Sequence, residues 1–227
     1  MKNLNVAVVG SNRGIGLELT KQLSQYGNTV YAFCRKSSSE LNDLKNIKIN
    51  VKIIDQFEVT DLRAMSLAIQ TAGLKNIDIL IHVSGILRED DLNDINEDGI
   101  LEQFKVNALA PILSVKAFLP LMSEGSKVGL ITSRMGSVAD NTSGGMYGYR
   151  MSKSALNMAG KSLSEDLKDQ DITVLLLHPG YVKTDMTGHQ GHITPKESAA
   201  GLIKILDEKT IDQTGTFWHV NGEALPW

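Results

Sequence analysis

The chain has 227 residues, of which 42% are hydrophobic and 22% are charged, so it is long enough to bury the core of one large α/β domain. Its net charge of −3 and pI near 6.0 offer no basic surface to nucleic acid, and no dense run of Lys and Arg would attract an anionic membrane. Cys34 is the single cysteine, and no cleavage-site pattern follows the first residues. No apolar run approaches the roughly 20 residues that span a bilayer. We therefore expect one cytoplasmic domain over residues 1–227.

Short runs rich in β-branched residues alternate with longer amphipathic segments along the whole chain. Fully apolar runs such as VAVV and VLLL are typical of parallel strands that are covered by helices on both faces. The alternation therefore predicts an α/β fold with a doubly wound, Rossmann-like, mostly parallel sheet of seven strands. The expected strands are residues 4–9, 29–33, 48–54, 77–83, 127–132, 172–178 and 216–220.

Two helices and two loops are the parts of this pattern that bear on a site. The first helix is expected over residues 15–26, with Gly27 as its stop signal, and a later helix over residues 149–167. The most turn-rich stretches, residues 140–145 and 187–194, both follow strands. Open α/β sheets bind their ligands beyond the carboxyl ends of the strands, so these stretches are candidate site loops.

The first expected strand is followed by GSNRGIG, which places three glycines directly before an amphipathic helix. Glycines let the backbone approach a phosphate closely, and the helix N-terminus directs free N–H groups and a positive dipole end at the anion. A plain glycine-rich turn is the alternative, but the position at the start of a βαβ unit favours a nucleotide. The expected phosphate-binding residues are Gly10, Ser11, Asn12, Arg13, Gly14, Ile15 and Gly16.

The second strand ends in AFCRK and carries no acidic residue where such folds bind the ribose 2′-hydroxyl of NAD. Cys34 stands there with Arg35 immediately after it, and Arg13 lies in the glycine turn. Guanidinium groups bind a 2′-phosphate through charge-assisted hydrogen bonds, so the pair predicts NADP(H) rather than NAD(H). The alternative reading is that Arg35 and Lys36 are solvated surface charges.

The stretch YGYRMSK offers two tyrosines upstream of one lysine. On a helix, Tyr149 and Lys153 are four residues apart and share a face, whereas Tyr147 diverges from Lys153 by roughly 120°. A phenol with a pKa near 10 is only about one part in a thousand ionised at neutral pH, and a nearby ammonium favours the phenolate. The spacing therefore favours Tyr149 as the partner of Lys153, and we interpret Tyr147 as a pocket wall just before the helix.

A serine hydroxyl can join this pair. The fifth strand runs KVGLITS and places Ser133 at its carboxyl end, where the crevice is expected. Ser137 and Ser143 are alternative hydroxyls, but neither ends a strand, and both positions are typical of turn residues that bond their own backbone.

With the glycine turn, Ser133 and the Tyr149–Lys153 spacing, the chain resembles the short-chain dehydrogenase/reductase family from Gly10 to its carboxyl terminus. The NGEALPW ending and the RMGS and NTSGG segments resemble its C-factor-like and sniffer-like carbonyl reductase group. The resemblance implies reduction of an aldehyde, ketone or quinone to an alcohol, or the reverse, with hydride transfer from the 4-pro-S position of the cofactor. It also implies that Ser133 holds the substrate oxygen, that Tyr149 is the acid/base, and that Lys153 lowers the pKa of Tyr149 and bonds the nicotinamide ribose.

The resemblance assigns further cofactor contacts, with two departures from the family pattern. EVTD stands where the family has DVTD, which implies adenine contacts for Glu58 and Val59. HVSG stands where the family has NNAG, so that only Gly85 is retained, and Ser84 is small enough for close approach of the nicotinamide ribose. We interpret His82 at this place as a buried core residue.

Two more segments match the family. Asn107 lies in FKVNALAP, and the resemblance implies that it bends its helix and holds a water that links Lys153 to solvent. The HPGYVKTDM segment is similar to the family's PG-x-V-x-T, which implies that the nicotinamide carboxamide is oriented by Pro179, Gly180, Val182 and Thr184.

Two other functions compete with a carbonyl reductase. A catalytically silent NADP(H)-binding sensor or signalling protein could use the same fold, but it would not need Ser133, Tyr149 and Lys153 together. An enoyl reductase of this family places its Tyr and Lys seven apart, and the residue seven before Lys153 is Met146.

Position alone suggests an open pocket for a small-molecule carbonyl or alcohol. The loop from Thr184 to the helix near Pro195 is short, and the expected lining is Met146, Tyr147, Met186 and His189. No metal site is expected. The family resemblance implies a homodimer or homotetramer that assembles through helices at residues 97–121 and 149–169.

Overall fold

The computed structural model describes residues 1–44 and 50–227, and its centre is a sheet of seven strands. The strands are β1 (Asn5–Val9), β2 (Thr29–Phe33), β3 (Val51–Ile54), β4 (Ile79–His82), β5 (Lys127–Ile131), β6 (Thr173–His178) and β7 (Thr216–His219). They lie in the order β3-β2-β1-β4-β5-β6-β7, and each neighbouring pair is parallel. The expected doubly wound sheet is confirmed, and these seven strands are all parallel rather than mostly so.

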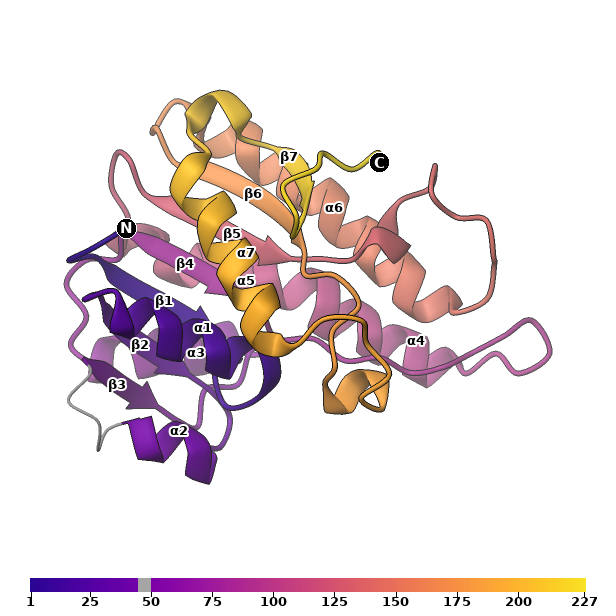
Figure 1. The fold of residues 1–227 in the computed structure, drawn as a ribbon, viewed down its shortest axis with the longest axis horizontal. Helices are drawn as coiled ribbons and strands as arrows, with labels where there is room; N and C mark the ends of the chain where they lie inside the picture. The colour runs from indigo at the N-terminus through magenta and orange to yellow at the C-terminus, as the bar shows by residue number, and fades with distance from the viewer. Residues whose placement is uncertain (45–49) are drawn as a thin grey trace.

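Helices cover both faces of the sheet (Figure 1). One face carries α1 (Gly14–Gln25) and α7 (Pro195–Glu208), which pack against each other. The other face carries α3 (Leu62–Thr71), α5 (Ala110–Phe118) and α6 (Tyr147–Lys168). The π-helical turn η2 (Lys105–Leu109) joins α4 (Glu97–Phe104) to α5, and the remaining short helices are α2 (Ser39–Asp43), η3 (Leu119–Leu121), η4 (Arg134–Gly136), η5 (Asp185–Thr187) and η6 (Ile211–Gln213).

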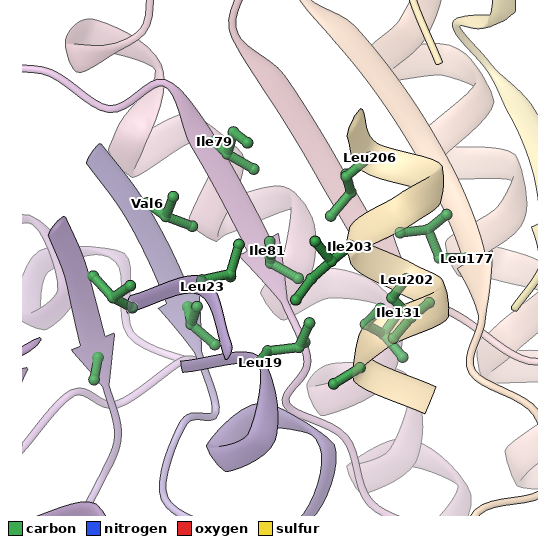
Figure 2. Close-up of a cluster of buried hydrophobic side chains, with 14 of the residues drawn as sticks. Val6, Leu19, Leu23, Ile79, Ile81, Ile131, Leu177, Leu202, Ile203 and Leu206 are labelled. Atoms are coloured by element: carbon green, nitrogen blue, oxygen red, sulfur yellow. The ribbon is translucent and has the colours of Figure 1, made fainter. Parts of the chain in front are cut away.

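The alternation of side chains along the strands divides the core into two layers. In β1, Val6 and Val8 point toward α1 and α7, whereas Ala7 and Val9 point toward the opposite helices, and all four are fully buried. Figure 2 shows the first layer, where Leu19 and Leu23 of α1 approach the strands beside residues of α7. Burying one Val or Leu side chain stabilises a fold by roughly 1.5–3 kcal/mol, so apolar strands need helices on both faces.

The predicted element boundaries are correct to within a few residues. The first helix begins one residue earlier than expected and ends at Gln25, with Gly27 adopting φ 90° just beyond it. The later helix begins at Tyr147 rather than Tyr149, so Tyr147 lies in its first turn and not before it. The expected third strand began at Lys48, and the part of it over residues 48–49 lies outside the described residues.

The helical run from Glu97 to Leu121 is 25 residues long and apolar enough to cross a membrane by length and composition. The expectation that no such run exists is therefore wrong. In the fold, α4 packs against α6, and α5 packs against α3 and β4. Val115 and Phe118 are buried in the core, so part of the apolar character of this run is used within the protein.

A charged group in the core would be costly, and His82 at the end of β4 is 1% exposed. Its Nδ1 lies 3.0 Å from the Ser114 hydroxyl oxygen on α5, which agrees with the interpretation of His82 as a core residue. Burial, with a smaller effect of the Lys153 ammonium, lowers the pKa of His82 to about 3. The imidazole is therefore neutral in the folded protein at neutral pH.

We predict that His82 makes the fold sensitive to acid. An unfolded chain protonates His near pH 6.5 and the folded chain only near 3, so unfolding takes up a proton and stability falls as pH drops below 6.5. Replacing His82 with Asn should shrink the loss of unfolding free energy between pH 7.5 and pH 5 by up to about 2 kcal/mol in urea titrations. His192→Asn, at an exposed site, is the control, and an equal effect of both changes would contradict the prediction.

Candidate active site

The parallel sheet brings the segments that follow its strands to one edge, and the turn after β1 meets the segment after β4 there. A β-carbon added at Gly10 would lie 2.7 Å from the Ser84 hydroxyl oxygen and 2.8 Å from the Ser84 nitrogen. One added at Gly16 would lie 1.9 Å from the Gly10 carbonyl oxygen. Gly10 also has φ 92°. The expected glycine turn is thus a place where the chain passes too closely for any side chain.

The N-terminus of α1 faces this turn without a cap from its own side chains. Arg13 is the capping residue but makes no side-chain cap bond, and the first turn of α1 carries no acidic residue. The free N–H groups and the positive dipole end are therefore available to an anion. Ser11 is buried and donates to the Phe33 carbonyl oxygen at 3.1 Å, which ties the turn to the end of β2.

The two predicted cations lie at neighbouring segments but do not point at a common partner. Asn12 donates to the Lys36 carbonyl oxygen at 3.1 Å, so the glycine turn lies beside the residues that follow β2. Arg35 is exposed there. The Arg13 guanidinium instead forms an ion pair with Asp185 of η5 at 3.2 Å, a partner that the sequence did not indicate.

Glu58 and Val59 also reach this edge, since the Phe57 nitrogen donates to the Cys34 carbonyl oxygen at 3.0 Å. Val59 is 8% exposed. The Glu58 carboxylate accepts hydrogen bonds from the Thr60 nitrogen at 3.1 Å and the Thr60 hydroxyl at 2.8 Å. Its side chain therefore shapes the local turn.

Asn107 lies in the π-helical turn η2 and is fully buried, so the expected local distortion of this helix is present. Its Oδ1 accepts from the Ile86 nitrogen at 2.8 Å, and its Nδ2 donates to the Ile86 carbonyl oxygen at 2.8 Å and to the Ser152 hydroxyl at 3.0 Å. Gly85 lies between this amide and the lysine, because an added β-carbon would be 3.2 Å from Asn107 Oδ1 and 3.7 Å from Lys153 Nζ. Asn107 thus ties the segment after β4 to α6.

Ser133, Tyr149 and Lys153 come together at the carboxyl end of β5. The Ser133 hydroxyl lowers the pKa of the Tyr149 phenol, but burial has the larger effect and raises it. Lys153 is 4% exposed, donates to the Ile131 carbonyl oxygen at 3.0 Å, and has its Nζ 5.8 Å from the centre of the Tyr149 ring. Burial lowers the pKa of Lys153 to about 8.

The expected lowering of the Tyr149 pKa by Lys153 is not found. The ammonium of Lys153 is directed at a backbone carbonyl of β5, and both side chains have lost most of their water. Desolvation disfavours the charged form of each group, which raises the pKa of the phenol and lowers that of the ammonium. The resulting pair is a protonated phenol beside a lysine that loses its proton more readily than usual.

The segment after β6 closes the edge. Gly180 has φ 83°, and Val182 is buried and forms a bridge with Ile193. Thr184 starts η5 and packs against the glycine turn, because a β-carbon added at Gly14 would lie 3.3 Å from its methyl carbon. Pro179, just before Gly180, accepts a hydrogen bond from the Ser198 hydroxyl at 2.7 Å.

The alternative hydroxyls have local roles. The buried Ser137 hydroxyl accepts from the Asp140 nitrogen at 3.1 Å, and the exposed Ser143 hydroxyl accepts from Arg150 at 2.8 Å. Neither bond reaches Tyr149. The interpretation of Ser137 as a residue that bonds its own turn agrees with the structure.

Of the expected substrate lining, Tyr147 lies at a cavity that Met146, Met186 and His189 do not line. Tyr147 lines a cavity of about 370 Å³ with Met135, Val138 and Met151, and Tyr149 is not among its lining residues. Met186 is exposed, and the His189 ring pairs with Asp185 at 3.3 Å. Among residues 1–44 and 50–227, no three His, Cys, Asp or Glu side chains gather in a way that could hold a metal ion.

Sequence reasoning missed several residues that the fold brings to the site: Ile86, Asp90, Gln103, Ser152 and Asp185. Ser152 was detectable in principle, because it lies three residues after Tyr149 on the same helix. The others act from distant segments, and no local pattern marks them.

The comparisons with known proteins agree with this geometry. The family model described as short chain dehydrogenase matches residues 4–193. A curated relative from Rhodococcus sp. (strain AD45), 1-hydroxy-2-glutathionyl-2-methyl-3-butene dehydrogenase, is 40% identical over 98% of this chain and 99% of its own.

Two solved carbonyl reductases have the same fold over their full lengths. The NADPH-bound carbonyl reductase from chicken fatty liver has a TM-score of 0.91 and 30% identity, with 100% of both chains covered. The carbonyl reductase Sniffer of D. melanogaster has a TM-score of 0.90 and 30% identity, again with 100% of both chains covered. The match covers most of the chain, and the glycine turn and the group of Ser133, Tyr149 and the buried Lys153 agree with it. This protein is therefore an oxidoreductase of the short-chain dehydrogenase/reductase family.

Proposed function

We propose that the protein is an NADP(H)-dependent carbonyl reductase that interconverts a small aldehyde, ketone or quinone and its alcohol, with Tyr149 as the acid/base. The observation that carries the proposal is the buried Tyr149 phenol beside the Ser133 hydroxyl and Lys153. Carbonyl reduction needs a proton donor and a group that holds the oxygen while charge develops on it, and these two hydroxyls can supply both.

The residues of the glycine turn fit a dinucleotide. No side chain would fit at Gly10 or Gly16. No side chain caps the N-terminus of α1, and its first turn carries no acidic residue. When bound, NADPH supplies the hydride. Arg13 and Arg35 are the residues proposed to hold its 2′-phosphate, and Pro179, Gly180, Val182 and Thr184 those proposed to orient the nicotinamide end.

The protonation states favour reduction at neutral pH. Because burial raises the pKa of Tyr149, the phenol keeps the proton that an alkoxide would accept. Ser133 would hold the substrate oxygen in the same position relative to Tyr149 throughout. Oxidation of an alcohol needs the phenolate instead, so it should require higher pH.

A second candidate reaction comes from the Rhodococcus relative, whose name describes a hydroxy compound that carries a glutathionyl group. At 40% identity over nearly the whole chain, an alcohol on a glutathione thioether is a reasonable second substrate class for this protein. The two classes share the chemistry at Ser133 and Tyr149, so a substrate panel should contain both.

We also propose that two copies of the chain associate through the outer faces of α4 and α6. These faces expose Leu101 and Phe104 of α4, and Met151 and Met158 of α6. Large exposed apolar side chains on adjacent helices mark association surfaces. Light scattering that gave the mass of one chain would contradict the homodimer.

Tyr149→Phe should lower kcat for carbonyl reduction by roughly 10²–10⁴-fold, because the ring remains and only the proton donor is lost. The measurement is the loss of NADPH absorbance with aldehydes, quinones, α-dicarbonyls and glutathione thioethers. Tyr147→Phe is the matched control two residues away and should keep most of the turnover. If the wild type binds NADPH but turns over no substrate in the panel, the catalytically silent sensor is favoured instead.

Replacing both Arg13 and Arg35 with Ala should raise KM for NADPH by about 10-fold or more, since charge-assisted hydrogen bonds contribute roughly 1.5–3 kcal/mol each. KM for NADH should change little, because NADH lacks the 2′-phosphate. Lys36→Ala tests whether any nearby cation has the same effect. Equal changes for the two cofactors in the double variant would contradict the assignment.

A further inference from the structure

The N-terminus of α6, the helix that carries Tyr149, lacks the usual cap. Met146 is the capping residue and adopts φ 54° and ψ 42°, a left-handed conformation that is uncommon for a residue with a side chain. Its side chain makes no cap bond. The N–H groups of a first helical turn have no partners within the helix, so something else must bond them.

Asp90, from the segment between β4 and α4, supplies that cap with two different groups. Its backbone carbonyl oxygen accepts from the Met146 nitrogen at 2.9 Å. Its carboxylate Oδ2 accepts from the Gly148 nitrogen at 2.9 Å, across a sequence separation of 58 residues. The carboxylate also lies at the positive end of the helix dipole, where a negative charge is stabilising.

Gln103 of α4 lies beside the carboxylate of Asp90 at this contact. The Gln103 side chain is fully buried, and its Oε1 accepts from the Arg88 nitrogen at 2.9 Å. A β-carbon added at Gly148 would lie 2.5 Å from Gln103 Nε2 and 2.9 Å from Asp90 Oδ2, so the two side chains meet over this glycine. Residue 148 must therefore be a glycine for the two side chains to reach the backbone of α6.

Two buried polar atoms at this contact complement each other. Asp90 Oδ1 is an acceptor and Gln103 Nε2 is a donor, and both are buried without another hydrogen-bond partner in the part of the chain that the structure describes. Both side chains come within 3 Å of the position that a β-carbon at Gly148 would occupy. An unpartnered buried acceptor or donor is costly, so a small rotation that joins these two atoms is favoured.

From these contacts we infer that Asp90 is a positioning residue for Tyr149. It fixes the first turn of α6 through Gly148, directly before Tyr149, and Gln103 holds the carboxylate in place. Tyr149 must keep its phenol within hydrogen-bond reach of Ser133, and a misplacement of about 1 Å in an active site can cost on the order of 100-fold in rate. The inference rests on the proposed function for its kinetic part only.

The test compares Asp90→Ala with Asp90→Asn in the full chain. Asp90→Ala removes the side-chain acceptor, so kcat for carbonyl reduction should fall about tenfold or more while KM for NADPH stays within about twofold. Asp90→Asn keeps an oxygen that can accept from Gly148, so it should restore most of kcat. Asp94→Ala is the matched control: Asp94 is an exposed acid in the same segment, and it takes no part in these contacts.

Amide hydrogen exchange over residues 145–152 provides a readout that does not need turnover. Asp90→Ala should speed exchange there by about tenfold or more relative to wild type and Asp94→Ala, since the Gly148 N–H loses its partner. Gln103→Met, which keeps the volume but loses the amide, should speed exchange in the same peptide. If Asp90→Ala does not fold, the Asp90→Asn and Gln103→Met comparison still decides the matter.

The outcomes separate this inference from the proposed function. Wild-type kcat and unchanged exchange in Asp90→Ala, or equal losses in Asp90→Ala and Asp90→Asn, would overturn the role of Asp90 while leaving carbonyl reduction intact. Absence of turnover in the wild type would overturn the proposed function. In that case faster exchange in Asp90→Ala still supports the cap on α6, and unchanged exchange overturns it.

Discussion

The parallel direction of all seven strands is the constraint on which the rest of this molecule depends. Because parallel strands end at the same edge, the segments after β1, β4, β5 and β6 meet there, although they are far apart in the sequence. The order changes direction between β1 and β4, and Gly10 and Ser84 come into near contact at that point. A nucleotide crevice at such a switch point follows from the connections and not from any single motif.

Close approach at this edge is possible only where side chains are missing. Gly16 lies against the Gly10 carbonyl, Gly85 against Asn107 and Lys153, and Gly148 against Gln103 and Asp90. At Gly85 and Gly148, side chains from distant parts of the chain pack on the glycine. These contacts fix the position of the backbone around the site, which the proposed reaction at Ser133 and Tyr149 would require.

Burial also sets the electrostatics of the site. His82, Tyr149 and Lys153 are all less than a tenth exposed, and each has a pKa displaced toward its neutral form by burial. Neutral groups are less costly to hold in the interior than charged ones, so the stability of the fold and the protonation of the site are linked. Tyr149 is therefore protonated at neutral pH, and Lys153 loses its proton more readily than an exposed lysine does.

The sequence by itself determined the doubly wound sheet and the positions of its seven strands within a few residues, because apolar runs and their alternation reflect burial directly. It also indicated that Ser133, Tyr149 and Lys153 would meet, since strand ends and helical spacing are local properties. The start of α6 two residues earlier was decided by contacts with Asp90, 58 residues away. Only the tertiary structure showed the ion pair of Arg13 with Asp185, the packing over Gly148 and the raised pKa of Tyr149. These features depend on distant partners and on loss of water, which a local sequence pattern does not reveal.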